Sequence, residues 1–151
     1  MDYRVVIPTE SYHVIEFVQE GEIGVAEVNV SLIAFEPKIV FPWHCSLMIV
    51  LEDRLENGLP TDAELSVFNE FDAKLDYTIK QDTVKPNALR LASIQWNGTI
   101  ELIWRVYDPE VTNQYLVDML ESKSYTRPFD YKISNDSDWS LCDWHFRHLK
   151  M

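Results

Sequence analysis

The stretch ALRLASIQWNGTIELIWRVY, residues 88–107, decides the fold. Two runs rich in apolar residues, 88–96 and 99–107, flank the pair Asn97-Gly98. Both residues of the pair tolerate the positive φ angle that a type I′ turn requires, so this pattern predicts a β-hairpin. The segments on either side of the hairpin have the pattern of helices.

Upstream, residues 61–80 begin with a capping-box pattern, in which Thr61 and Glu64 each satisfy a free N–H of the first turn. The apolar residues that follow share one stripe of an amphipathic helix: Leu65, Phe68, Phe71 and Leu75. Downstream, residues 109–122 predict a second helix. It starts with Pro109, because the missing N–H of proline costs nothing at the first helical position.

Two further runs complete a core. Residues 43–52 are a nearly continuous apolar run of strand length, and residues 125–134 predict a last strand. From residue 43 the order is strand, helix, strand, strand, helix, strand, which is the split βαβ arrangement of ferredoxin-like folds. We therefore predict an α+β fold, a ferredoxin-like βαββαβ antiparallel sheet with an added N-terminal β-hairpin and a C-terminal helix.

The chain is expected to form a single domain over residues 1–151, because its length is typical of one. Its predicted parts are a hairpin extension (1–36), the ferredoxin-like core (43–134) and the C-terminal helix (136–150). Within the extension, strands are predicted over 12–19 and 22–35.

Two stretches resemble a known family. YKISNDSDWSLCDW (131–144), with Asp138-Trp139 after a strand, is similar to the bacterial domain-of-unknown-function family six-nine-five, and so is GLPTDAELSVFNEFDAKL (58–75). The βαββαβ order resembles the related ribonuclease E inhibitor B superfamily. The resemblance implies a ferredoxin-like fold, no known enzymatic activity and, through the inhibitor relatives, acidic protein–protein binding. It brings no catalytic residues.

The net charge of −12 limits the partners. Nucleic-acid binders usually carry a basic field, so direct binding of nucleic acid or of an anionic membrane is not expected. A basic protein partner is favoured instead, although acidic charge also serves solubility alone. Two cysteines, no signal-peptide pattern and no long apolar run predict a soluble cytoplasmic protein.

The acidic residues are concentrated at one end. The first 36 residues contain seven Asp or Glu and a single Arg. We predict a partner-binding surface of hairpin carboxylates and sheet aromatics: Glu16, Glu20, Glu22, Glu27, Trp96 and Trp104. The simpler alternatives are that charged edges block strand pairing and that the tryptophans belong to the core. Free sheet edges also allow a homodimer.

The C-terminal histidines suggest an alternative function. Cys142, His145 and His148 follow one another at three-residue steps, and His44 lies upstream. These four residues are the candidate metal ligands of a small metal-binding protein or metal-dependent hydrolase. The competing interpretation is a packing helix, with an apolar stripe made of Trp139, Cys142, Phe146 and Leu149.

No credible catalytic set is present, and no cofactor is expected. Both cysteines lie in apolar surroundings, where a reactive thiolate is disfavoured. The leading hypothesis is a non-enzymatic acidic protein-binding module, such as an inhibitor of a nuclease or an immunity-type protein. A ligand-sensing domain with a pocket between sheet and helix is the remaining interpretation.

Overall fold

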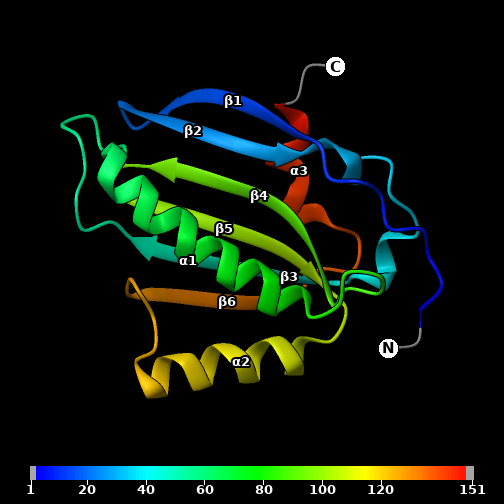
Figure 1. Cartoon of the computed structure of the whole chain (residues 1–151). Coiled ribbons are helices and arrows are strands. Elements are labelled where there is room, and N and C mark those ends of the chain that lie inside the picture. Colours follow the sequence, from blue (N-terminus) through cyan, green and yellow to red (C-terminus); the bar gives the residue numbers. More distant parts are fainter. Residues whose placement is uncertain (1–2, 149–151) are drawn as a thin grey trace.

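A computed structural model describes residues 3–148 of the protein. Six strands form one antiparallel sheet in the order β1-β2-β4-β5-β3-β6 (Figure 1). The strands are β1 (Tyr12–Gln19), β2 (Glu22–Asn29), β3 (Trp43–Val50), β4 (Ala88–Trp96), β5 (Thr99–Val106) and β6 (Phe129–Asn135). The helices are α1 (Asp62–Lys80), α2 (Pro109–Ser122) and α3 (Asp143–Arg147), with 3₁₀ turns η1 (Val30–Leu32), η2 (Lys38–Val40) and η3 (Ser140–Cys142).

The predicted α+β architecture is confirmed. The units β3-α1-β4-β5-α2-β6 form a ferredoxin-like core with strand order β4-β5-β3-β6, and the hairpin β1–β2 extends the sheet beside β4. Asn97 and Gly98 have φ angles of 46° and 81°, as the turn between β4 and β5 requires. None of the described helices is long and apolar enough to cross a membrane.

The sheet carries a separate hydrophobic core on each face. On one face, α1 and α2 pack on residues such as Leu47, Leu102 and Trp104. On the opposite face, the N-terminal segment, the 3₁₀ turns and the C-terminal segment pack on residues such as Leu91 and Ile103. Figure 1 shows α3 behind the sheet, across from α1. The hairpin strands β1 and β2 lie beyond the region that α1 covers.

The N-terminus of α1 forms only half of the predicted capping box. The Thr61 Oγ1 accepts a hydrogen bond from the Glu64 N–H at 3.2 Å, as predicted. The Glu64 carboxylate instead accepts hydrogen bonds from Arg127 and from the Glu52 N–H. It turns away because an arginine from the loop before β6 offers a charge-assisted pair.

Two predicted elements are shorter than expected. The strand predicted over 22–35 ends at Asn29, whose Oδ1 accepts hydrogen bonds from the Ser11 and Ser31 N–H groups and so starts η1. The strand predicted over 125–134 begins only at Phe129, after a loop that contains Pro128.

The predicted C-terminal helix is present, but within the described residues it spans only Asp143–Arg147 of the expected range 136–150. Trp139 adopts the left-handed conformation with φ of 60°, and only the turn η3 and the short α3 follow it. The cause lies at Asp136, whose carboxylate accepts hydrogen bonds from the Ser140 hydroxyl and the Leu141 N–H and so closes a local turn. Residues 149 and 150 of the predicted helix, including Leu149, lie outside the described residues.

Candidate functional site

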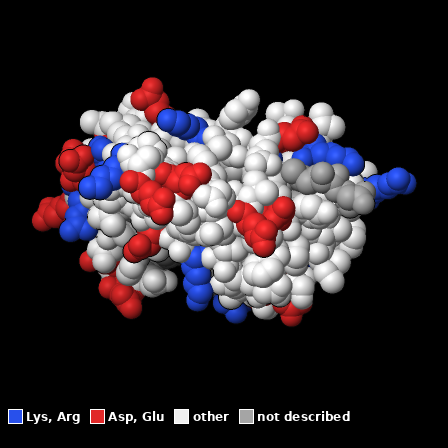
Figure 2. All heavy atoms as spheres, turned by 90° about the horizontal axis from the view of Figure 1, so that it is seen from below, with Lys and Arg blue, Asp and Glu red and all other residues white. Residues whose placement is uncertain are grey.

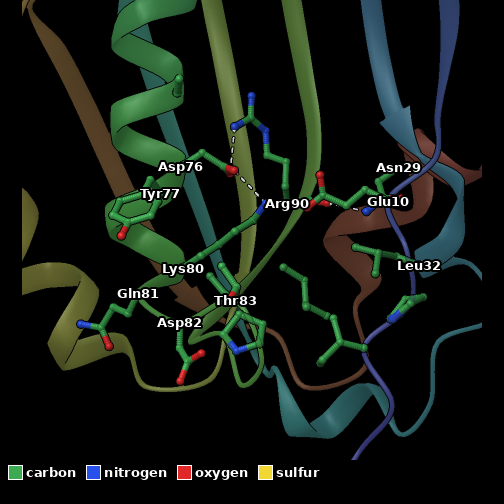
Figure 3. A pocket seen from close by; sticks show the side chains of 16 residues that line it. Glu10, Asn29, Leu32, Asp76, Tyr77, Lys80, Gln81, Asp82, Thr83 and Arg90 are labelled. Atoms are coloured by element: carbon green, nitrogen blue, oxygen red, sulfur yellow. Dashed lines mark hydrogen bonds and ion pairs between the residues drawn. The ribbon is translucent and has the colours of Figure 1, made fainter.

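A cavity of about 470 Å³ opens between α1, the N-terminal segment and the beginning of β4 (Figure 3). Its floor is apolar and includes Ile7, Leu32 and Leu89. Its rim is charged, because the C-terminal half of α1 and the following loop supply Asp76, Lys80 and Asp82. An apolar floor with a few converging polar groups is the usual composition of a binding site.

Arg90 is the centre of the charged rim. Its side chain is only 8% exposed and pairs with both Asp72 oxygens, at 2.8 and 3.0 Å. Its Nη1 also donates to the Asp76 Oδ1 at 3.2 Å, and its guanidinium lies 4.9 Å from the centre of the Trp104 ring. The two carboxylates and the ring compensate the charge that β4 buries here.

Lys80 connects this cluster to the N-terminal segment. Its ammonium pairs with the Asp76 Oδ2 at 2.7 Å and with the Glu10 carboxylate, as Figure 3 shows. Burial alone would lower the pKa of Lys80, but the hydrogen bonds and charges of Asp76 and Glu10 raise it. The pKa of Asp76 is lowered, because Arg90 and Lys80 outweigh its burial. Both groups are therefore charged at neutral pH.

A second cavity, of about 370 Å³, continues along α1 towards the hairpin. It shares Ala73, Asp76 and Arg90 with the first and reaches Tyr12 and Glu27. We call the two cavities together the α1 groove. Five carboxylates line it, namely Glu10, Glu27, Asp72, Asp76 and Asp82. Among the residues that the structure describes, the cations that line it are Lys80 and Arg90, which are already paired within the chain.

The four predicted hairpin carboxylates do not form one patch. The register pairs Val14 with Glu27 and Glu16 with Val25, so Glu16 and Glu27 share the face of the α1 groove. Glu22 pairs with Gln19 and lies on the opposite face, and Glu20 lies in the turn with φ of 52°. Beside Glu16 and Glu27, the open face carries exposed apolar residues: Val14, Val18 and Ile23.

The model of the Family of unknown function (DUF695) matches residues 14–146 of the chain. The chain belongs to the DUF695 family. No curated protein and no solved structure matches it significantly. The match runs from β1 to α3, so the DUF695 region includes the hairpin as well as the ferredoxin-like core.

The two tryptophans predicted for the partner surface have different environments in this DUF695 chain. Trp104 is fully buried under α1, where its Nε1 donates to the Asp76 Oδ1 at 2.8 Å. Its prediction as a surface residue is therefore wrong. Its indole N–H instead holds Asp76, which lines the groove. Trp96 is half-buried on the opposite face, and its Nε1 donates to the Gln19 carbonyl at 3.2 Å.

The predicted metal ligands do not converge on one point. The His44 Nδ1 lies 3.0 Å from the guanidinium of Arg105, which also donates to the Cys142 Sγ. The His148 Nδ1 is hydrogen-bonded to the Trp144 carbonyl at 2.7 Å. Over residues 3–148, no three His, Cys, Asp or Glu side chains are grouped closely enough to hold a metal ion.

Burial also makes one of these ligands, the Cys142 thiol, a poor one. It lowers the pKa of His44 to about 4, with help from the nearby Arg105 charge, and raises the pKa of the Cys142 thiol to about 11. A neutral thiol beside a fixed guanidinium is a weak metal ligand, because metals bind the thiolate. The geometry therefore does not favour the metal-dependent alternative.

Sequence reasoning missed the residues that shape the groove. Asp72 and Asp76 lie four residues apart on α1 and therefore on one helical face, and Arg90 interrupts an apolar strand. An arginine in a buried strand needs a carboxylate partner. The spacing of the two aspartates could have supplied that signal.

Proposed function

We propose that this DUF695 protein is a non-enzymatic binding module, and that it engages a basic segment of a partner protein along the α1 groove. One observation carries the proposal. The lining of the groove has five carboxylates and two cations, and both cations are already engaged by internal pairs. The groove is therefore left with a net negative potential, which attracts and orients positive side chains.

The open face of the hairpin extends the groove with apolar contacts. Val14 and Val18 are 64% and 70% exposed; Glu16 lies between them along β1, and Glu27 lies opposite Val14 on β2. A helix that carries apolar residues on one face and Lys or Arg on its flanks matches this surface. A second copy of this chain matches it poorly, because each copy has a net charge of −12.

Acidic side chains also lie on the surface outside the α1 groove. Figure 2, which views the molecule from below, shows Asp and Glu in several separate groups with Lys and Arg between them. Exposed acids on α2, such as Glu121, therefore provide a control position of the same charge.

The finer features of the proposal follow from charge. A nuclease is a suitable partner, since a protein that binds nucleic acid carries a basic surface, and an inhibitor or immunity-type role would follow. A relation to the ribonuclease E inhibitor B superfamily is supported by the βαββαβ order. Such a role would place the protein in the cytoplasm, and neither a cofactor nor a catalytic residue is part of the proposal.

The test uses a labelled amphipathic helical peptide of Leu and Lys, with fluorescence anisotropy as the measurement. We expect Glu27→Lys to weaken binding about tenfold, because it places a cation in the groove. The matched control Glu121→Lys makes the same change of net charge on α2 and should change affinity less than about twofold. Equal losses in the two variants would show that only overall charge matters and would overturn the proposal.

A further inference from the structure

A third cavity lies on the opposite face of the sheet, separate from the α1 groove. This aromatic cavity has a volume of about 320 Å³. Its walls are the rings of Phe17, Trp96 and Trp144, the apolar side chains Met48 and Ile94, and one carboxylate, Glu101. We propose that the aromatic cavity binds an alkylated ammonium group, with its positive nitrogen beside Glu101 and its alkyl groups against the rings.

The rings are held in place by contacts within the protein. Phe17 packs directly on Gly24, its cross-strand partner, where a Cβ atom would come within 2.1 Å of the ring. Phe17 also meets Trp144 edge to face, with ring centres 5.3 Å apart. Trp96 is anchored by its hydrogen bond to the Gln19 carbonyl. The cavity is therefore preorganised, which reduces the entropic cost of binding.

The charges of the lining select a cation. Glu101 is the only acidic residue among the described residues that line the cavity, and no Lys or Arg is among them. Its carboxylate accepts a hydrogen bond from the Ser46 hydroxyl, which fixes one oxygen on the sheet. A cation is attracted to the faces of aromatic rings, and a nearby carboxylate adds to that attraction.

His145 forms the wall on the side of α3 and is 7% exposed. Its Nδ1 makes no hydrogen bond with any residue that the structure describes. Burial lowers the pKa of His145 to about 4 against the opposing effect of the Cys142 carbonyl, so the ring is neutral at pH 7 and does not repel a cation.

Other occupants fit less well. A neutral apolar ligand would cover Glu101 and leave its charge without compensation, which is costly. An anion would face that carboxylate with no cation in the lining to balance it. A primary ammonium would pair with Glu101 but would leave the three aromatic walls largely unused.

Calorimetric titration with choline and with 3,3-dimethyl-1-butanol tests the proposal, because the two compounds have the same shape and differ in charge. We expect choline to bind at least about fivefold more tightly than the neutral analogue. Glu101→Gln should remove this preference and leave the neutral analogue unaffected. The control Glu121→Gln removes the same charge on α2 and should preserve the preference.

Trp96→Leu should weaken the binding of choline at least about fivefold. Thermal melting checks that Trp96→Leu and Glu101→Gln both fold. The same head group occurs on free solutes and on trimethylated lysines, so a Gly/Ser peptide with one trimethyllysine is titrated beside its unmodified form. Tighter binding of the modified peptide than of choline would assign the site to a protein ligand, and the reverse to a solute. Equal affinity for choline and its neutral analogue, or no binding of choline up to about 10 mM, would overturn the proposal.

Discussion

Arg105 is a fully buried cation in β5, and its main partners lie in the segment after β6. Its guanidinium donates to the Asp136 Oδ2 at 2.8 Å and to the Asp136 carbonyl at 2.6 Å, and it lies 4.7 Å from the centre of the Trp139 ring. It therefore holds the start of the C-terminal segment on the sheet. From the sequence, Arg105 reads only as a polar interruption of an apolar strand, because its partner is 31 residues away.

We expect Arg105→Met to lower the free energy of unfolding by about 3–5 kcal/mol, because it leaves the buried Asp136 charge without its partner. Urea unfolding at pH 7 measures this loss. The double variant R105M/D136N removes both charges and should recover part of the stability. A double variant less stable than R105M alone would contradict the assigned ion pair.

Glu64 gives a pH-dependent prediction. Its hydrogen bonds with Arg127 are the main cause that lowers its pKa to about 2, well below the ordinary 4.5. A lowered carboxyl pKa stabilises the fold above the unfolded-state value, and that stability is lost as pH falls from about 4.5 towards 2. Glu64→Gln should therefore cost about 2 kcal/mol at pH 7. Urea titrations at pH 7 and pH 3 should show the cost shrinking, and an unchanged cost would contradict the assignment.

At the scale of helices and strands, the sequence patterns that predicted the structure correctly are local ones. The Asn97-Gly98 turn, the Thr61 cap and the Pro109 start each act within a few residues, and all three structures form. The C-terminal helix starts later than predicted, because distant contacts act together with the local Asp136 turn on the conformation of Trp139. Its indole N–H donates to the Lys38 and Phe41 carbonyls, about a hundred residues earlier in the chain, which no local pattern reveals.

The cap of α1 can be tested directly. Thr61→Ala should lower the free energy of unfolding by about 1 kcal/mol, because the Glu64 N–H loses its hydrogen-bond acceptor. Ser66→Ala is the matched control, since Ser66 is exposed within the same helix and alanine favours helix formation. Chemical unfolding of both variants should give opposite signs, and a neutral Thr61→Ala would mean that the cap does not contribute.

At the scale of the whole molecule, the candidate sites were only partly predictable. Glu27 was expected on a partner surface and lines the α1 groove, and Trp96 and His145 were singled out and meet in the aromatic cavity. The sequence could not show that Glu16 and Glu22 lie on opposite faces, because this depends on the hairpin register. Nor could it bring Glu10 to Lys80, 70 residues away.

The strand order predicts how protection from hydrogen exchange is distributed. β5 and β3 each have a hydrogen-bonded neighbour on both sides, whereas β1, within residues 3–148, pairs with β2 alone. We expect amides of β5 to exchange at least about a hundredfold more slowly than those of β1. Exchange followed by NMR measures this difference, and equal protection in β1 would point to a further layer on that edge.

The sheet separates two packed layers, and this arrangement has an evolutionary consequence. Substitutions on the α3 side touch one core and those on the α1 side touch the other, so their effects on stability should add nearly independently. A descendant of this chain can therefore redesign one side without compensating changes on the other. Within the DUF695 family, substitutions on the two sides of the sheet are then expected to accumulate independently of one another.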